Sequence, residues 1–508
     1  MFDDFVDDVG MAKQRTLEIP DHLVEDFLES DIEAITRFYT NSIGMDVLLA
    51  RKFGDPSMKR TIDLVKEEAA EQTARATTRA ERKKIADDLK RDLTDIRGLR
   101  DKLRGTYGLP NDPYRPLSRA LRIGKIWNVL TLGGGFTLSA IPDMGRVVMT
   151  EGLKNSVGYG LKQMFNGQGR AVLSLMKEEL QLSGTALDMV LGTRALQFAD
   201  ISDVYGKKFK FERGLMRAQG AFFIVNAMHM WNTGMKQFAG TVAGLRIVDD
   251  CMNWSTISQA SREKLLRHGI DENMAERIAF QVREHGEQIN GTWVPNTELW
   301  QLGSRADTNA MRHYRAALNQ DADRTIITPN VGDRALWTST EFGSVIAQFK
   351  SFGQSALPKL LISGLQERDA AFFTGLTLLV AMGHLTNEIK RQQYGDTRER
   401  SFHENLVEAI DRSGALGVLM DINNTTEKLS NYQLGLKPML GMAPPYDASF
   451  KSKFGALFGP TGTQLANASE IISDVLSGDV DHWTKKRARL LVPGQNLPFL
   501  DPVADRMF

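Results

Sequence analysis

Three stretches without a charged side chain interrupt a sequence that is otherwise one quarter charged. They run from Ile126 to Pro142, from Ala218 to Met235 and from Ala370 to Asn387, and they are 17, 18 and 18 residues long. Each is close in length to the shortest helix that can cross a bilayer. Each also contains polar residues, so none is typical of a permanent transmembrane helix. Two interpretations stay open: the stretches are buried helices of a large helical core, or they insert into lipid only under some conditions.

Large apolar side chains of the last two stretches are the candidates for contact with lipid or for a seam between subunits. They are Phe222, Phe223, Trp231, Phe372, Phe373, Leu376 and Leu379. Thr374, Thr377 and His384 would be costly against lipid, so we expect these three to face other helices. The phenylalanines and leucines of the third stretch are then expected to face outward or into a seam.

Apolar residues recur at helical spacing elsewhere in the chain. Ser30 and Glu33 form the pair of a capping box, which predicts a helix that begins near residue 30. From about 62 to 104 the chain is densely charged, but isoleucine and leucine recur at steps of three and four and form one narrow apolar stripe. This segment is predicted to be a long solvated helix or a helical hairpin that packs one face on a partner.

A further helix is predicted after Asp271, whose side chain is suited to cap a first turn. Met274, Ile278 and Val282 follow at spacings that place them on one face of that helix. Gly286 favours the end of the helix at that position.

Proline and glycine divide the chain into regions. The stretch from Gly105 to Pro116 cannot continue a helix, because three prolines and two glycines interrupt it. The expected regions are a charged helical region (1–104), an apolar helical domain (117–285), an irregular connecting region (286–338), a second apolar helical domain (339–434) and a Pro/Gly-rich C-terminal region (435–508) with a helix near 463–477. Within the connecting region, the sequence around Asn290-Gly291 could supply at most short edge strands. The predicted fold class is all-α: an elongated, multi-segment helical protein with Pro/Gly-rich hinges and minimal strand.

Composition narrows the classes of function. The single Cys251 excludes an intrachain disulfide and a Cys-x-x-Cys ligand pair. Lysine and arginine (63) balance aspartate and glutamate (63), so the summed charge cannot by itself hold a polyanion. The N-terminus is acidic where a secretory signal needs a basic region and then an apolar one, so no export signal is expected. Any contact with DNA or membrane must therefore use local patches.

The strongest basic cluster lies near the C-terminus. Its members are Trp483, Lys485, Lys486, Arg487 and Arg489. The cluster is a candidate for binding phosphates of DNA or headgroups of anionic lipid, with the tryptophan at the interface. The alternative is an ordinary solvated helix face.

The sequence carries no complete signature of catalysis or of cofactor binding. The eight histidines include no HExxH or other short metal-ligand spacing. The triplet Gly133-Gly134-Gly135 lacks the Gly-Lys-Ser/Thr ending of a phosphate-binding loop. Glu29-Ser30 faintly resembles the Glu-Ser pair of lytic transglycosylases, without the rest of that pattern. We therefore expect no catalytic residue, no metal and no cofactor, and a protein that is not an enzyme.

Several phrases of the sequence resemble one protein family. They are Asp46 to Asp55, Tyr107 to Arg122, Leu138 to Asp143, Gln348 to Phe352 and Arg489 to Leu500. These phrases are similar to the C-terminal regions of the large internal virion proteins, or DNA-ejection proteins, of tailed bacteriophages, and short-tailed phages are the expected source.

The resemblance implies a helical protein that is stored in the capsid near the portal and ejected into the host envelope, from periplasm to inner membrane. There it would join other ejection proteins, and further copies of itself, in a conduit for the genome. Conditional contact with the host membrane and nonspecific contact with phage DNA are further expectations. Two alternatives stay open: a peptidoglycan-degrading virion enzyme, and a DNA-binding injection or packaging factor.

Overall fold

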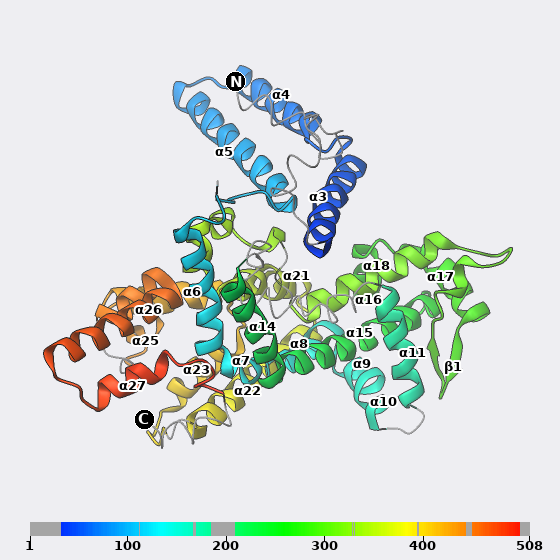
Figure 1. The fold of residues 1–508 in the computed structure, drawn as a ribbon. Coiled ribbons are helices and arrows are strands. Elements are labelled where there is room, and N and C mark those ends of the chain that lie inside the picture. The colour runs from blue at the N-terminus through cyan, green and yellow to red at the C-terminus, as the bar shows by residue number, and fades with distance from the viewer. Residues whose placement is uncertain are drawn as a thin grey trace. The chain divides into compact units, whose positions relative to one another are not determined.

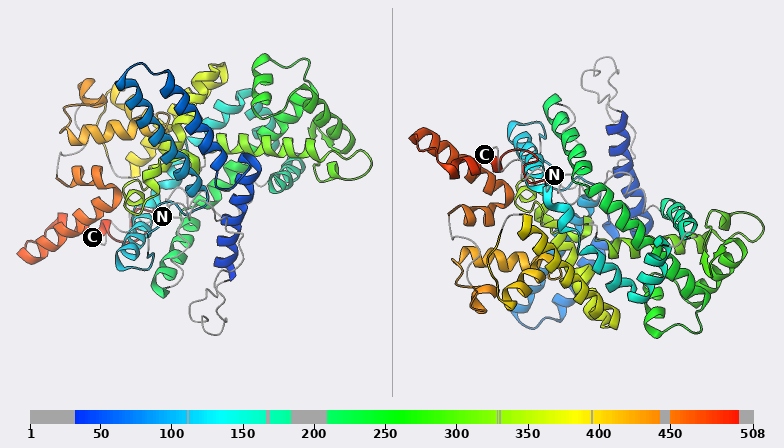
Figure 2. Two further views of the ribbon diagram at one scale, coloured as in Figure 1. Left: turned by 90° about the horizontal axis from the view of Figure 1, so that it is seen from above. Right: turned by 90° about the horizontal axis from the view of Figure 1, so that it is seen from below.

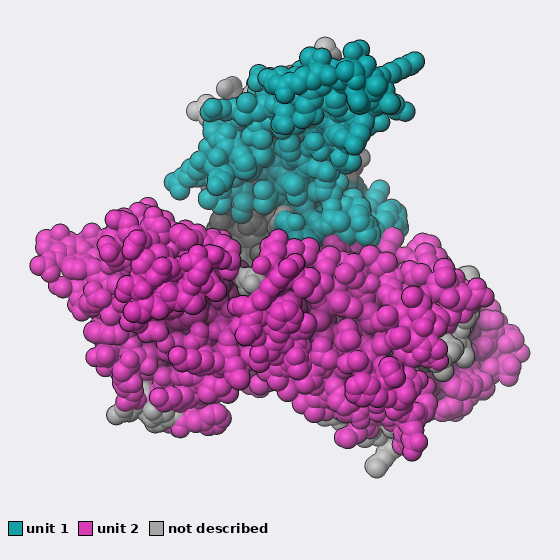
Figure 3. All heavy atoms as spheres, turned by 180° about the vertical axis from the view of Figure 1, so that it is seen from behind, with its two compact units in different colours: residues 1–122, 203–210, 331–344 teal, residues 123–202, 211–330, 345–508 magenta. Residues whose placement is uncertain are grey.

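The fold is almost wholly helical, with 76% helix and 1% strand, which confirms the predicted all-α class with minimal strand. The computed structural model describes residues 32–110, 112–165, 169–183, 209–327, 329, 331–393, 396–442 and 450–497. The chain divides into two compact units, coloured separately in Figure 3. Unit 1 comprises residues 1–122, 203–210 and 331–344, and unit 2 comprises residues 123–202, 211–330 and 345–508.

Unit 1 is built around a helical hairpin, as the stripe between 62 and 104 allows. Its helices are α3 (Ile32–Phe53), α4 (Lys59–Arg75) and α5 (Arg79–Leu103), with short turns η6 (Val331–Asp333) and η7 (Leu336–Ser339). Thr78 caps α5 in a capping box with Glu81, because each side chain satisfies a backbone N–H of the other residue. Arg104 Nε lies 2.6 Å from Asp46 Oδ1, and this ion pair ties the end of α5 to α3. The helix expected near residue 30 begins by Ile32; Ser30 lies outside the described residues.

Unit 2 contains most of the remaining elements (Figures 1 and 2). Three of the described helices have residues in both units: α6 (Pro116–Leu132), α19 (Glu341–Ile346) and α14, whose first residue Lys210 belongs to unit 1. The elements up to residue 294 are η2 (Gly133–Gly135), α7 (Phe136–Ser139), α8 (Asp143–Glu151), α9 (Leu153–Asn155), η3 (Ser156–Leu161), α10 (Lys162–Phe165), α11 (Gly169–Leu182), α14 (Lys210–Val225), α15 (Met228–Met252), α16 (Gln259–Arg267), α17 (Glu272–His285), β1 (Glu287–Ile289) and β2 (Thr292–Val294). The later elements are η5 (Leu299–Gln301), α18 (Thr308–Thr325), α20 (Ser351–Ala356), η8 (Leu357–Ile362), α21 (Ser363–Glu367), α22 (Ala370–Gln393), α23 (Phe402–Ser413), α24 (Val418–Leu429), α25 (Leu436–Met439), α26 (Phe450–Ser477) and α27 (His482–Leu490).

One core of unit 2 surrounds α15, which packs on α11, α17 and α18. The predicted helix after Asp271 is α17, and Asp271 accepts a hydrogen bond from the backbone N–H of Met274 at 2.8 Å. Ile278 and Val282 of α17 are fully buried in this core. Trp300 and Tyr314 also lie in it, with ring centroids 5.7 Å apart.

The segment expected to be an irregular connection, 286–338, differs from that expectation. The short strands are there as expected: β1 and β2 pair antiparallel, with Glu287 opposite Val294, across a turn at Asn290-Gly291. The same segment, however, also contains the 18-residue helix α18. Asp307 caps it by accepting from the Ala310 N–H at 2.9 Å. The helix was missed because small residues, Ala310, Ala317 and Ala322, share its buried face with the larger apolar ones and weaken the apolar stripe.

The C-terminal region contains more helix than expected. The helix predicted near 463–477 is the second half of α26, which begins already at Phe450. Gly459, with φ of 65°, breaks the helical backbone just before Pro460. Pro460 lacks the N–H that a helix interior needs, so the kink falls there.

A buried ionic network joins four helices of unit 2. Arg246 of α15 pairs through its three guanidinium nitrogens with Glu151 of α8 at 2.6 Å, Asp250 of α15 at 2.7 Å and Asp321 of α18 at 2.5 Å. Lys264 of α16 lies 2.9 Å from Glu151. Arg246 and Lys264 hold the pKa of the Asp321 carboxyl well below its usual range, against the opposing effect of burial. One guanidinium therefore neutralises carboxylates from three different helices.

Replacement of Arg246 by Met should lower the free energy of unfolding of unit 2 by about 3–5 kcal/mol, because buried carboxylates lose their counter-charge. Urea unfolding followed by circular dichroism measures the change. Arg305→Met is the control, because Arg305 is 65% exposed beside Glu284 and such a pair contributes about 1 kcal/mol or less. Equal effects of the two substitutions would contradict a central role for the network.

Candidate functional site

Helix α22 corresponds to the third uncharged stretch. Asp369 accepts a hydrogen bond from the Phe372 N–H at 2.7 Å and so satisfies a donor of the first turn. Lys390 and Arg391 occupy the last turn, where cations complement the helix dipole. Within the part of the chain that the structure describes, α22 is the one helix long and apolar enough to cross a membrane, and 33% of its apolar window is buried. Core helices of soluble proteins share these properties.

The buried stripe of α22 owes its close packing to glycine. Gly375 lies against the backbone of Met149 in α8, and Gly383 lies against the backbone of Ala409 in α23, so neither position has room for a Cβ. On α8, a Cβ at Gly145 would come within 2.7 Å of the Leu379 backbone nitrogen. The backbone of α22 therefore approaches both neighbouring helices closely.

In the packed form, α22 does not have the facing expected for contact with lipid or a subunit seam, except at Phe373. Phe372 and Leu379 are buried at 1% and 0% exposure, in a core with Met149 and Leu360, and Leu376 is partly buried beside them. Phe373 is 54% exposed, and Thr374, Thr377 and His384 are exposed as well. The reason is the position of the glycines. The face with Gly375 and Gly383 allows the closest contact between helices. Phe372 and Leu379 lie three and four residues from Gly375, on the same face, and are buried with it.

The first two uncharged stretches pack on each other instead of forming single long helices. Phe222 and Phe223 of α14 are buried in one core with Ile126, Val129 and Leu130 of α6. Trp231 packs against the same core and is partly buried. The chain breaks between α14 and α15 at residues 226–227, where Ala227 has φ of 58°. In the packed form, large side chains of both stretches therefore lie in one shared core.

The basic cluster near the C-terminus lies on α27 and is divided in its roles. Arg487 pairs with Glu470 and Asp474 of α26, both at 2.7 Å, and so fastens the two helices together. Trp483 is 58% exposed, and the Lys486 ammonium lies 5.3 Å from the centroid of its ring. The other members, Lys485 and Arg489, are exposed and half-buried, respectively.

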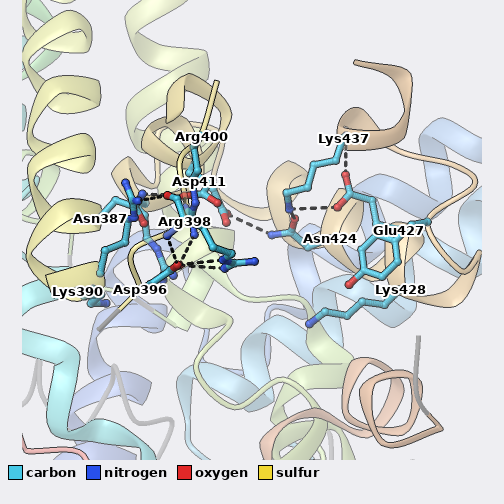
Figure 4. Close-up of a pocket in the computed structure, with 14 residues that line it drawn as sticks. Asn387, Lys390, Asp396, Arg398, Arg400, Asp411, Asn424, Glu427, Lys428 and Lys437 are labelled. Atoms are coloured by element: carbon cyan, nitrogen blue, oxygen red, sulfur yellow. Dashed lines mark hydrogen bonds and ion pairs between the residues drawn. The ribbon is translucent and has the colours of Figure 1, made fainter. Parts of the chain in front are cut away.

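A hollow of about 350 Å³ lies at the C-terminal end of α22 (Figure 4). Its lining comes from α22, the segment 396–400, α23, α24, Tyr432 and α25. Figure 4 shows Asn424, Glu427, Lys428 and Lys437 across the hollow from Asn387, Lys390, Asp396, Arg398 and Arg400. We call this hollow the basic pocket.

Basic side chains outnumber carboxylates in the lining of the basic pocket. The seven basic residues are Lys390, Arg391, Arg398, Arg400, Arg412, Lys428 and Lys437. The four carboxylates are Asp396, Glu408, Asp411 and Glu427. The lining thus carries a surplus of three positive charges.

The four carboxylates of the basic pocket already have donors. Asp396 accepts from Arg398 and Arg400, which holds the pKa of its carboxyl well below the usual range. Glu408 pairs with Arg400 and accepts from Asn387 at 2.7 Å. The remaining two carboxylates are engaged as well, Asp411 by Asn424 and Glu427 by Lys437.

Lys390 and Arg412 account for part of the surplus charge. The Lys390 ammonium donates to the Ser139 hydroxyl at 2.6 Å, and no described carboxylate lies within ion-pair distance of Lys390 or Arg412. Burial lowers the pKa of Lys390 to about 8, and the charge of nearby Arg412 adds to the effect. Burial and the charge of Lys437 likewise lower the pKa of Lys428. Positive charge is therefore concentrated in the pocket at an electrostatic cost.

The sequence reasoning missed the basic pocket. Its residues come from segments with no shared motif, and the one local signal was the run of mixed charge from Glu388 to Arg400. The Glu29-Ser30 pair that the enzymatic alternative rests on lies outside the described residues. Among the residues that are described, no cluster of His, Cys, Asp and Glu could hold a metal ion.

Comparison of the chain with models of protein families, with curated proteins and with solved structures finds no match.

Asp421 of α24 interacts with Asp411 and Lys428 of the basic pocket, and the pKa of its carboxyl is raised. Burial raises the pKa of its carboxyl to about 6, and Asp411 adds to this, while Lys350 and Lys428 oppose it. The folded protein therefore keeps this proton at a pH where the unfolded chain has released it. The contribution to stability is present at acidic pH and is lost as the pH rises through about 6.

Asp421→Asn should consequently stabilise the protein at pH 8 by about 1 kcal/mol, a value that allows for the partial exposure of the side chain. Near pH 4 the variant and the wild type should unfold at similar temperatures, because both side chains are then neutral. Thermal unfolding between pH 4 and 8 measures the difference. A difference that does not change with pH would contradict the raised pKa.

Proposed function

We propose that the chain is an internal virion protein of a tailed bacteriophage, packaged in the capsid and ejected to help form a conduit for the genome across the host envelope. Its role in this proposal is structural and not enzymatic. The phrases between Asp46 and Leu500 that resemble ejection proteins support the family. The observation that carries the proposal is α22, a helix of membrane-spanning length that packs against α8 and α23 and leaves one face exposed.

The dimensions of α22 suit a bilayer. The uncharged stretch of 18 residues, at 1.5 Å per residue, would span roughly 27 Å, close to the thickness of the hydrocarbon layer. Asp369 and Glu388 flank it, so charges would lie at the two interfaces. In lipid, helices associate through small residues that allow close backbone approach. The Gly375 and Gly383 contacts of the packed form are of this kind.

Release of α22 from its present contacts has a cost that lipid can offset. Phe372 and Leu379 would leave the core, and full burial of such a side chain is worth about 1.5–3 kcal/mol. A bilayer offsets the lost burial free energy, because its interior is as apolar as the protein core. The polar hydroxyl of Thr377, by contrast, already hydrogen-bonds its own helix at the Phe373 carbonyl, which reduces its cost in lipid.

Assembly with further copies and with other ejected proteins is part of the proposal. Exposed apolar side chains on α26 support it: Leu465, Ile472 and Leu476 are 60%, 58% and 82% exposed. Their spacing of seven and four residues places them on one helix face. Apolar surface of this kind is typical of regions that a partner covers.

Insertion of α22 can be tested with Thr377→Asp, because Thr377 is exposed in the packed form and lies near the middle of the uncharged stretch. Wild-type protein should float with vesicles of phosphatidylethanolamine and phosphatidylglycerol. In the floated protein, α22 should be protected from added protease by the bilayer. A mid-membrane Asp costs roughly 2.5–3.5 kcal/mol, so the variant should partition roughly 70- to 400-fold less.

Thr426→Asp is a matched control for this experiment. Thr426 is also exposed within a helix, and its hydroxyl donates to the carbonyl four residues earlier at 2.9 Å, as that of Thr377 does. The control should float like the wild type. Equal flotation of the Thr377 variant, or a wild type that ignores vesicles, would show that α22 is an ordinary core helix.

A role in ejection predicts where the protein is found during infection. Mass spectrometry should detect the chain in purified virions of the phage that encodes it, and its amount should fall after ejection is triggered with the DNA. Protein that is absent from virions, or that stays in emptied capsids, would contradict the proposal.

A further inference from the structure

The basic pocket combines surplus positive charge with a defined hollow. Lys390, at the end of α22, and Arg412, at the end of α23, both line the hollow without a described carboxylate partner. The pocket's own carboxylates are engaged by other donors, Asp396 by two arginines and Glu427 by Lys437. A negatively charged ligand would therefore meet two cations that the protein leaves uncompensated.

We propose that the basic pocket binds a small phosphate-bearing anion, held between Lys390 and Arg412. Phosphate oxygens accept from the planar fork of a guanidinium and from an ammonium, which acts as a point charge. The amide of Asn387 and the ring of Tyr432 also line the hollow. A volume of about 350 Å³ is at the lower end of the range for small-molecule sites, which suits a phosphate monoester or a lipid headgroup and not a long polymer.

The competing explanation is that Lys390 and Arg391 only complement the dipole at the C-terminus of α22. That explanation covers two cations of the last turn, but it leaves out Arg412, Lys428 and Lys437, which other helices bring to the same hollow. Burial, with the charge of Arg412, also lowers the pKa of Lys390, so the charge of Lys390 is disfavoured in the pocket. Convergence of cations from four helices, α22, α23, α24 and α25, favours a ligand.

The inference does not rest on the proposed function, because the pocket is complete in the packed form, whether or not α22 ever inserts into lipid. Its test is calorimetric titration of the full chain with inorganic phosphate and with glycerol phosphate at pH 7. Wild-type protein should bind saturably. Lys390→Gln combined with Arg412→Gln should weaken binding at least tenfold. The single variant Lys390→Arg, which keeps both positive charges, should retain most of the wild-type affinity.

The matched control removes one Lys and one Arg elsewhere in unit 2. Arg170 and Lys177 are exposed on α11 and do not line the pocket, so Arg170→Gln combined with Lys177→Gln should change binding less than twofold. A second measurement needs no variant: phosphate should protect Lys390 of the wild type from acetylation and leave Lys177 as reactive as before. Absence of saturable binding, or an unaffected double variant, would overturn the proposal, and so would unprotected Lys390.

The phosphate group could belong to a lipid headgroup or to a free small molecule. Binding to phosphatidylcholine vesicles with and without phosphatidic acid distinguishes these two sources. A headgroup ligand requires binding to the phosphatidic acid vesicles that inorganic phosphate displaces and that the Lys390/Arg412 variant loses. A free ligand requires binding of the soluble phosphates without retention on those vesicles. Vesicle binding that survives the double variant would assign the membrane contact to another surface.

Discussion

The arrangement of unit 2 depends on neutralising buried acid. Glu151 and Asp321 are fully buried, and carboxylates in such positions are stable only when opposite charge lies beside them. Arg246 supplies that charge at the point where α8, α15 and α18 meet, and Lys264 adds a second cation from α16. The network fixes α8 in place, and α8 in turn carries Gly145, against which α22 packs. The position of the candidate membrane helix thus follows from an ionic contact at the other end of α8.

Features that depend on near neighbours in the sequence could be predicted. The Asp271 cap, the Asn290-Gly291 turn and the break at Gly105 to Pro116 each need only a few consecutive residues, and the structure has all three. The ionic network could not be predicted in this way, because Arg246 and Glu151 are 95 residues apart. Neither lies in a motif, and in the sequence each is typical of a solvated surface residue. The basic pocket could not be predicted for the same reason, because its cations come close together only when the helices pack.

The three uncharged stretches show why composition does not determine placement. The first stretch is interrupted at the glycine triplet and the second at Ala227. The two stretches pack on each other in a core that contains Phe222 and Phe223. The triplet has a second use, since Gly134 donates its N–H to Asn496 at 3.0 Å where the C-terminal segment crosses closely. The third stretch has no such break, and it forms one continuous helix. All three stretches lack charged side chains, and the positions of breaks and glycines distinguish the structures that they form.

Helix α22 connects the two proposals through a simple linkage. Asn387, Lys390 and Arg391 form its contribution to the basic pocket, so a movement of α22 away from α23 and α24 would dismantle the pocket. A ligand that binds only the packed arrangement stabilises it, by an amount that grows with the ligand's concentration relative to its dissociation constant. An anion held between Lys390 and Arg412 would therefore oppose release of α22, and its loss would favour release. The proposed membrane helix thus ends at the proposed anion site.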